Sequence, residues 1–257
     1  MKIVFIGAGN VATHLAWALK ENGHEIIQVY SRTQLSAETL AQQLNTDFCI
    51  SLDKLKQADM YIYALSDNAI ETIVNQVNIY SGIHIHTAGS INMNIFERKF
   101  EKFGVFYPLQ TFSKDKKIDL SQVPIFVEGN STDTTKTLLN LAKTLTNKPL
   151  EANSSQRIQL HIAAVFACNF SNYLYSIAAD LLLENNLPFD ILHPLIIETA
   201  SKIQTLSPYE AQTGPARRND TVTIKKQLDK IGNENYKKIY SEMSEQISKK
   251  YRKEEDC

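Results

Sequence analysis

The sequence has little cysteine and no excess of positive charge. Its 257 residues include only three cysteines, which lie far apart and form no CxxC pair: Cys49, Cys168 and Cys257. We therefore expect reduced thiols, with neither a disulfide framework nor a cysteine-based metal site. Lysine and arginine together number 27 against 28 aspartate and glutamate residues, a formal net charge of -1. Because this balance leaves no basic surplus to neutralise a phosphate backbone, we expect no nucleic-acid partner.

Long hydrophobic runs are also scarce. The apolar run at the N-terminus, Ile3 to Ile6, is far shorter than the core of a signal peptide. The most apolar long stretch, residues 160–183, is interrupted by four polar residues: His161, Asn169, Asn172 and Asp180. A membrane-spanning helix needs about 20 predominantly apolar residues. We therefore expect no membrane partner and a cytoplasmic location.

The first 152 residues alternate short apolar runs with amphipathic stretches. The runs predict strands at residues 2–6, 25–30, 60–65, 83–87, 104–107 and 125–128. The amphipathic stretches predict helices at residues 11–22, 35–44, 69–76 and 134–144. This alternation is typical of βαβ units on a parallel sheet, and fully apolar strands are expected where helices cover both faces.

The strand pattern stops after residue 152. Residues 156–184 contain neither proline nor glycine and predict one long helix, followed by helices at 189–206, 221–232 and 235–251. Ser207 to Glu210 resembles a capping box with proline at the first helical position. We therefore predict an α/β fold: a doubly wound, Rossmann-type, mostly parallel sheet over residues 1–152, followed by an all-helical second domain over residues 153–257.

A glycine-containing turn directly follows the first predicted strand and opens the first predicted helix. Its sequence is of the GxGxxA type, Gly7-Ala8-Gly9-Asn10-Val11-Ala12. The first glycine permits the tight turn, the second lets the backbone approach a pyrophosphate, and the alanine allows the helix to pack closely on the strand. Because the helix start offers free N–H groups and the positive end of its dipole, we expect contacts to a dinucleotide from Gly7, Gly9, Asn10 and Val11. The alternative is a glycine turn that only packing requires.

The end of the second strand indicates which dinucleotide binds. A site for NAD places a carboxylate there to hold the ribose hydroxyls, whereas this chain has Ser31, Arg32 and Thr33. Arg32 can pair with a 2′-phosphate, and the two hydroxyls can donate hydrogen bonds to it. The residues therefore favour NADP(H) over NAD(H). The alternative is a solvated surface arginine.

Two further strand ends should face the same crevice, because ligands of open α/β sheets bind beyond the carboxyl ends of the strands. After the third predicted strand, Leu65 and Ser66 are expected along the nicotinamide side, while Asp67 could equally cap the next helix. After the fourth, Thr87 belongs to a small, hydroxyl-rich turn, His86-Thr87-Ala88-Gly89-Ser90. His84 shares a strand face with His86, but no third ligand lies nearby in the sequence, so we expect no metal.

These motifs carry a resemblance to a known group of proteins. The phosphate loop, Ser31-Arg32-Thr33 and the segment Ala64-Leu65-Ser66-Asp67-Asn68-Ala69-Ile70 resemble the NADP-binding domain of pyrroline-5-carboxylate reductase, of the deazaflavin-dependent NADP reductases and of the wider 6-phosphogluconate-dehydrogenase-like superfamily. Three segments resemble a bacterial subgroup that adds a helical C-terminal domain of unassigned function: His86-Thr87-Ala88-Gly89-Ser90, Tyr107-Pro108-Leu109-Gln110-Thr111-Phe112 and Thr213-Gly214-Pro215-Ala216-Arg217-Arg218-Asn219-Asp220.

The resemblance implies an NADP-dependent oxidoreductase, often dimeric through the helical domain, with no defined substrate. One departure is informative. The β-hydroxyacid dehydrogenase branch of the superfamily carries a catalytic lysine on the first long helix after the nucleotide domain, followed four residues later by asparagine. This chain has no lysine between Arg157 and Lys202. Lysine-assisted oxidation of hydroxyacids is therefore not expected here.

Candidates for the chemistry must position a hydride acceptor and move one proton. His161 could transfer the proton, since its reference pKa lies near neutrality, and Asn169 shares its helix face and could orient a carbonyl or imine. Alternatively, both are hydrogen-bonded inside a helix packing interface. Tyr107 ends a strand and could line the substrate site or donate a proton. The adjacent Arg217 and Arg218 follow a turn and could clamp a carboxylate or phosphate of the substrate, or could form a solvated pair beside Asp220.

The sequence thus predicts an NADP(H)-dependent oxidoreductase that acts on a small carbonyl or imine substrate bound between the two domains. Because the long helix is apolar around much of its circumference, we also expect a homodimer built on it. Two alternatives stay open: a non-catalytic NADP(H) sensor or scaffold, and an enzyme that passes hydride between NADP and a deazaflavin.

Overall fold

A computed structural model describes residues 1–113 and 118–252 of the chain. The chain forms two compact units, Met1–Ala167 and Cys168–Cys257. The last strand ends at Glu151, next to the expected boundary at residue 152, but the first compact unit continues to Ala167. It does so because the first turns of the following helix pack on the sheet, where Ser154 and Arg157 are buried.

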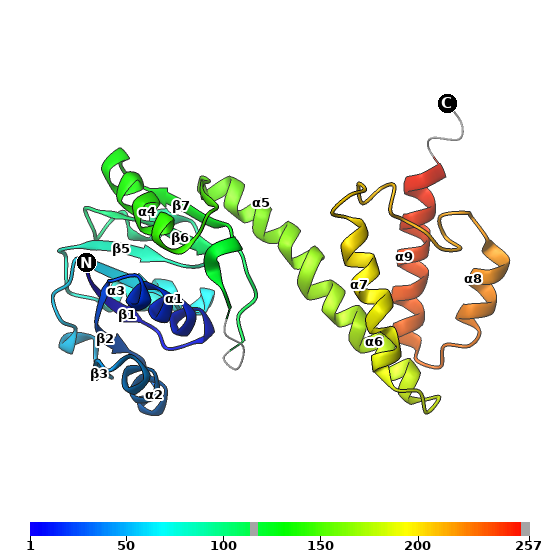
Figure 1. The fold of residues 1–257 in the computed structure, drawn as a ribbon, viewed down its shortest axis with the longest axis horizontal. Coiled ribbons are helices and arrows are strands. Elements are labelled where there is room, and N and C mark those ends of the chain that lie inside the picture. The colour runs from blue at the N-terminus through cyan, green and yellow to red at the C-terminus, as the bar shows by residue number, and fades with distance from the viewer. Residues whose placement is uncertain (114–117, 253–257) are drawn as a thin grey trace. The chain divides into compact units, whose positions relative to one another are not determined.

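The first unit is built on one sheet of eight strands (Figure 1). The strands are β1 (Lys2–Ile6), β2 (Glu25–Tyr30), β3 (Asp47–Cys49), β4 (Met60–Tyr63), β5 (Ile83–His86), β6 (Phe103–Pro108), β7 (Ile125–Gly129) and β8 (Pro149–Glu151). Their order in the sheet is β3-β2-β1-β4-β5-β6-β7-β8. The first six strands are parallel and have the order of a doubly wound dinucleotide-binding sheet, so the predicted fold class is confirmed.

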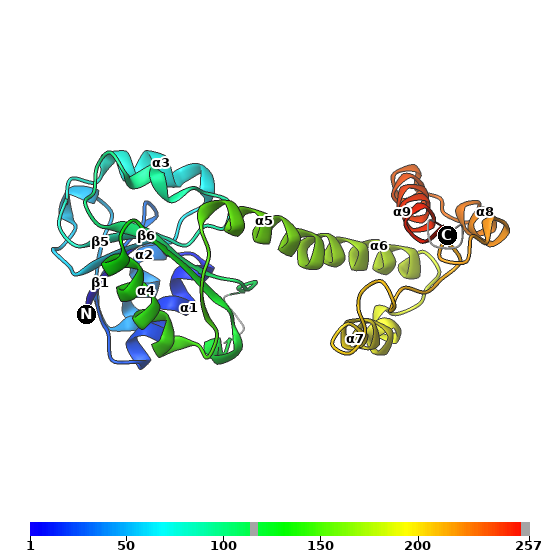
Figure 2. The same cartoon turned by 90° about the horizontal axis from the view of Figure 1, so that it is seen from above.

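Helices cover both faces of this sheet. They are α1 (Asn10–Glu21), α2 (Gln34–Leu44), α3 (Asp67–Gln76), α4 (Thr132–Leu145) and α5 (Ser154–Ala164). Figure 2 shows α3 on one side of the sheet and α1 and α4 on the other. Two buried apolar clusters match these layers: α1, α2 and α4 pack with residues such as Ile3 and Phe5, while α3 packs with their neighbours Val4 and Ile6. Alternate residues of β1 therefore serve opposite cores, which explains why the strand is apolar throughout.

Three features of the sheet differ from the pattern expected from the sequence. β7 runs antiparallel to β6, and the two edge strands, β3 and β8, are additional. Each of the latter has three residues, too few to show an apolar period. Among the strands that the structure describes, β8 pairs with β7 alone, and Leu150 is exposed on it. A short strand of this kind is held by its ladder rather than by its side chains, so composition does not reveal it.

The predicted long helix is present but contains a change of geometry. It runs from Ser154 to Leu183 as α5, a π-helical segment at Val165–Phe170, and α6 (Ser171–Leu183). The π-helix has i→i+5 hydrogen bonds, so it alters the angular spacing on which the shared face of His161 and Asn169 was predicted. Asn153 begins the helix with a capping box that includes Gln156.

The second unit contains α6, α7 (His193–Lys202), α8 (Thr221–Leu228) and α9 (Glu234–Arg252). The Ser207–Glu210 hydrogen bonds of a capping box are present, but a turn rather than a helix follows them. Within the described part of this unit, the buried hydrophobic residues are few: Ile177, Ala216, Ile231 and Tyr251. This unit therefore has a very small core of its own.

The helix over Ser154–Leu183 is also apolar along much of its length, although polar residues interrupt it. By length and composition alone, it is long and apolar enough to cross a membrane. The most apolar part of this helix is not buried among the described residues. Length and composition do not distinguish a membrane span from a helix that packs on another protein.

Candidate functional site

A crevice of about 360 Å³ lies at the carboxyl ends of β1, β2 and β4. Its lining comes from the turn after β1, the segment after β2 with the start of α2, and the segment after β4 with α3: Gly7, Ala8, Gly9, Asn10, Tyr30, Ser31, Arg32, Thr33, Ser36, Ala64, Leu65, Ser66, Ala69 and Ile73. The crevice therefore occupies the edge of the sheet at which ligands of doubly wound folds bind.

Most residues predicted to contact the cofactor line this crevice, with two exceptions. Val11 is partly buried against the core under α1, and Thr87 is buried just beyond β5, where its N–H donates to the Tyr63 carbonyl at 3.3 Å. Ser36 is an additional lining residue. It lies in the first turn of α2, three residues after Thr33, a spacing that directs both hydroxyls to one helix start.

The two glycines of the turn, Gly7 and Gly9, are explained by different features of the structure. Gly7 has a φ of 119°, and a Cβ there would lie 2.2 Å from the Ala64 carbonyl oxygen. Both the backbone conformation and the close approach of β4 thus require glycine at position 7. Gly9 has an ordinary φ of -85°, and a Cβ there would meet no protein atom within 4 Å. Packing therefore does not explain Gly9, whereas a ligand that approaches the backbone would.

The helices that begin at the crevice lack side-chain caps. α1 begins after Gly9, α2 after Thr33 and α3 after Ser66, and none of these residues caps its helix with a side-chain hydrogen bond. In the same unit, α4 and α5 are capped by Ser131 and Asn153. An uncapped helix start offers unpaired N–H groups and a partial positive charge, the arrangement that binds phosphate. The crevice thus fits an anionic dinucleotide at more than one point.

The charged end of the crevice lies where β2 meets α2. Arg32 is exposed there, between Ser31 and Thr33. The hydroxyl of Ser31 accepts a hydrogen bond from the Thr33 N–H at 3.3 Å, which shapes the turn. A guanidinium, hydroxyls and an uncapped helix start within six residues form a cationic, donor-rich pocket suited to an additional phosphate.

The structure brings together two of the residues proposed for the chemistry. The Tyr107 hydroxyl at the end of β6 lies 3.0 Å from Nδ1 of His161 on α5. The His161 ring also covers Gly89, since a Cβ on Gly89 would lie 2.5 Å from the same Nδ1. Gly89 belongs to the turn after β5, next to β4 in the sheet. The pair therefore lies beside the strand ends where the nicotinamide side was predicted.

Burial and neighbouring charges both shift the pKa of Tyr107. Burial raises the pKa of the Tyr107 hydroxyl above its usual range; Arg157 acts in the opposite direction and Asp67 adds to the increase. The hydroxyl therefore stays protonated at neutral pH. Asp67 is exposed at the start of α3 and accepts a hydrogen bond from Ser90 rather than capping its own helix.

The strand histidines are packing residues. His84 is stacked between Tyr61 and Phe100, and its Nδ1 lies 3.0 Å from the Tyr63 hydroxyl. Burial lowers the pKa of His84 to about 4 and that of His86 to about 3. Among the residues that the structure describes, no group of three or more His, Cys, Asp or Glu side chains could hold a metal ion.

The other proposed residues belong to the second unit. Asn169 is exposed in the π-helical segment. The Arg217 guanidinium lies 4.0 Å from the centroid of the Tyr251 ring and 5.3 Å from that of Tyr209, so the aromatic pair holds its side chain. Arg218 is exposed. The two adjacent arginines thus differ in surroundings, and cation–π packing accounts for Arg217.

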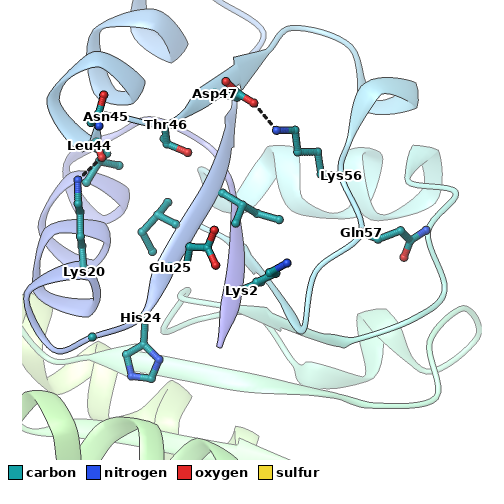
Figure 3. Close-up of a pocket in the computed structure, with 13 residues that line it drawn as sticks. Lys2, Lys20, His24, Glu25, Leu44, Asn45, Thr46, Asp47, Lys56 and Gln57 are labelled. Atoms are coloured by element: carbon teal, nitrogen blue, oxygen red, sulfur yellow. Dashed lines mark hydrogen bonds and ion pairs between the residues drawn. The ribbon is translucent and has the colours of Figure 1, made fainter.

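A larger hollow, of about 830 Å³, lies at the opposite end of the strands (Figure 3). It is bordered by the beginnings of β1 and β2 and the last turns of α1 and α2. Figure 3 shows two of its three lysines engaged, with Lys20 bonded to the Leu44 carbonyl and Lys56 paired with Asp47. Helix C-termini carry partial negative charge, so this hollow lacks the features that make the crevice an anion site.

The doubly wound sheet and its crevice define an NAD(P)-binding, oxidoreductase-like fold. A family model described as "NADP oxidoreductase coenzyme F420-dependent" matches residues 2–85, and one described as a domain of unknown function, DUF2520, matches residues 123–247. The chain belongs to the family that joins these two domains. The resemblance inferred from the motifs is thereby confirmed.

Known proteins show the same relationship. A candidate NADP oxidoreductase from Bacteroides fragilis is 43% identical, with a TM-score of 0.90 over 96% of this chain and 98% of that one. A 1-pyrroline-5-carboxylate reductase from Streptococcus pyogenes shares the fold at 16% identity, with a TM-score of 0.65 over 97% and 98% of the two chains. An L-aspartate dehydrogenase from Methanococcus maripaludis is 32% identical over 96 residues, which are 35% of this chain and 36% of that protein. The chain thus spans about a third of the length of this curated relative.

Proposed function

We propose that the protein is an NADP(H)-dependent oxidoreductase that reduces a small substrate with a C=O or C=N bond. The observation that carries this proposal is the Tyr107–His161 hydrogen bond beside the turn after β5, at the same sheet edge as the nucleotide crevice. A protein that only sensed NADP(H) would need the crevice, but it would not need a proton-transferring pair beside it.

The preference for NADP(H) over NAD(H) rests on the β2–α2 turn. Arg32, the nearby hydroxyls and the uncapped start of α2 offer several donors to a 2′-phosphate. No carboxylate among the residues lining the crevice would repel that phosphate. A hydrogen bond to a charged group contributes about 1.5–3 kcal/mol, which corresponds to about 10- to 100-fold in affinity.

In the proposed reaction, bound NADPH supplies the hydride, and the chain must supply one proton to the substrate heteroatom. Tyr107 and His161 form a hydrogen bond of 3.0 Å, so the member nearer the substrate can donate a proton to it and be reprotonated by the other. The raised pKa of Tyr107 keeps its hydroxyl protonated until it is used. His161 remains able to exchange protons with solvent because it is only partly buried.

The test is an NADPH oxidation assay with a panel of small aldehydes, ketones and cyclic imines, together with an oxidised deazaflavin. We expect turnover of a carbonyl or imine by the wild type and a fall in kcat of about 100-fold or more in His161→Gln and Tyr107→Phe, the range typical of general acid–base residues. His193→Gln and Tyr80→Phe are matched controls at exposed positions. NADPH binding without turnover of any acceptor would support the sensor alternative, and turnover of the deazaflavin alone would support the second alternative.

We also propose that the protein is a homodimer formed through the second unit. Its described residues bury few hydrophobic side chains, while Leu183, Ile191, Leu195 and Ile197 are each more than half exposed. A unit of this size needs more buried apolar surface to be stable, and the same patch on two copies can supply it around a twofold axis.

Light scattering after size-exclusion chromatography tests the dimer. We expect twice the chain mass of 29.1 kDa for the wild type and dissociation or unfolding for Leu195→Glu, with Gln204→Glu as the exposed polar control. A monomeric wild type would refute the dimer. Flotation of the wild type with lipid vesicles would instead assign the apolar face to a membrane.

A further inference from the structure

We propose that Arg157 is a positioning residue that fixes His161 against Gly89 and Tyr107, an inference that rests on the proposed role of the Tyr107–His161 pair. Arg157 lies four residues before His161, so both project from the same face of α5. This face is directed at the sheet, since Ser154 and Arg157 are buried and His161 is partly buried.

Arg157 connects three parts of the chain. One end of its guanidinium pairs with Glu128 on β7, and the other donates to the Ile91 carbonyl and to the Ser154 hydroxyl, the latter at 3.2 Å. The Arg157 side chain is 1% exposed and that of Glu128 is 11% exposed. The flat, forked guanidinium is the only cationic side chain that can hold a carboxylate and a second acceptor in fixed directions.

The contacts of Arg157 with Glu128, Ile91 and Ser154 form a clamp, and Glu128 extends this clamp to the beginning of the helix. Its Oε1 accepts the Ser154 N–H at 2.8 Å, and its Oε2 accepts the Ser154 hydroxyl at 2.7 Å. The first turn of α5 is thereby fixed to β7. The next turn carries His161.

The Ile91 contact makes the clamp relevant to chemistry. Ile91 lies two residues after Gly89, so Arg157 holds the turn after β5 and α5 against each other. That is the juxtaposition in which the His161 ring covers Gly89, with no room for a Cβ. A buried charge pair is a weak source of net stability, because desolvation offsets much of its attraction. A geometric role therefore explains this buried pair better than a stabilising role does.

Arg157→Lys is the direct test, because lysine keeps the charge but cannot hold both Glu128 and the Ile91 carbonyl. The first readout needs no substrate: long-range ¹H–¹⁵N correlation spectra report the tautomer and hydrogen bonding of the His161 ring, with its signals assigned by their loss in His161→Gln. We expect one ordered state in the wild type and averaged, shifted signals in Arg157→Lys. The control Arg98→Lys changes an exposed arginine of the same unit and should leave the spectrum unchanged.

The second readout is kinetic, with the substrate found in the panel above. We expect kcat to fall about 10- to 100-fold in Arg157→Lys, while KM for NADPH stays within about twofold, because misplacement of a reacting group affects the chemical step. Glu128→Gln, which keeps the shape of the acceptor, should change both readouts in the same direction and serves if Arg157→Lys does not fold. Gly89→Ala should displace the His161 ring directly, because the new methyl group would collide with it.

The outcomes separate this inference from the proposed function. Unchanged His161 signals in folded Arg157→Lys or Glu128→Gln protein would overturn the positioning role, whatever the enzyme does. If KM for NADPH rises and the protein loses stability while the His161 signals stay unchanged, Arg157 likewise serves the fold alone. If the wild type turns over no acceptor, the proposed function fails, and the spectra still decide the clamp.

Discussion

Replacement of Gly9 by alanine distinguishes an effect on NADPH binding from an effect on stability better than any other change in the crevice. The new methyl group would meet no protein atom within 4 Å, and the backbone at this position, with φ -85° and ψ -171°, suits alanine. The change in unfolding free energy should therefore be small. Alanine at a helix N-cap is less favourable than glycine by up to about 1 kcal/mol, and the reduced entropy of the unfolded chain offsets about 0.4–1 kcal/mol of that cost.

The effect on NADPH should be much larger. The methyl group would stand between the pyrophosphate and the N–H groups at the start of α1. Loss of one charged hydrogen bond costs about 1.5–3 kcal/mol, so we expect affinity to fall at least about 10- to 100-fold. The assays are calorimetric titration with NADPH and urea unfolding of the same preparation.

Two matched variants complete this experiment. Gly232→Ala also adds a methyl group in open space, but in the second unit, and should change neither quantity. Gly7→Ala should destabilise the protein itself, because its positive φ and the 2.2 Å approach to the Ala64 carbonyl leave no place for a side chain. Unaltered NADPH affinity in folded Gly9→Ala protein would refute the assignment of this turn to the pyrophosphate.

Two further predictions concern charge. Arg32→Ala should weaken NADPH binding about 10- to 100-fold in fluorescence titrations and leave NADH binding nearly unchanged, since only NADPH carries the 2′-phosphate; an equal loss for both would contradict the assignment. The folded-state pKa values of His84 and His86 are about 4 and about 3, below the pKa of about 6.5 of a histidine in an unfolded chain. As the pH falls, the unfolded state therefore takes up protons first, and the free energy of unfolding decreases below about pH 6.5. In urea unfolding, the free energy of unfolding should fall by about 2 kcal/mol per histidine between pH 7 and pH 5. In His86→Gln it should fall by about 2 kcal/mol less than in the wild type over the same interval. An identical pH dependence in the two proteins would count against a buried, neutral His86.

The local motifs were predictable because their meaning depends on short-range geometry. Gly7, Gly9 and Arg32 follow strands that the apolar pattern identifies, and strand ends of one parallel sheet meet at one edge. Ser36 escaped notice because serine in a first helical turn has no distinctive pattern. The strands β3 and β8 were missed because pairing with a neighbour, rather than their own composition, determines them.

The contacts that complete the site depend on long-range packing. Tyr107 and His161 were each singled out, but their 54-residue separation gives no sign that they share a hydrogen bond. Glu128 and Arg157 are 29 residues apart and looked like ordinary charged residues on a strand and a helix. The π-helical segment is a further example, because its i→i+5 hydrogen bonds leave no period in the sequence.

Calorimetric titration of the wild-type protein with NADPH and with NADH is the decisive test that the crevice binds NADP(H). We expect saturable binding of one NADPH per chain, and binding of NADH that is weaker by about 10- to 100-fold. No heat and no saturation with NADPH at millimolar concentration would contradict it.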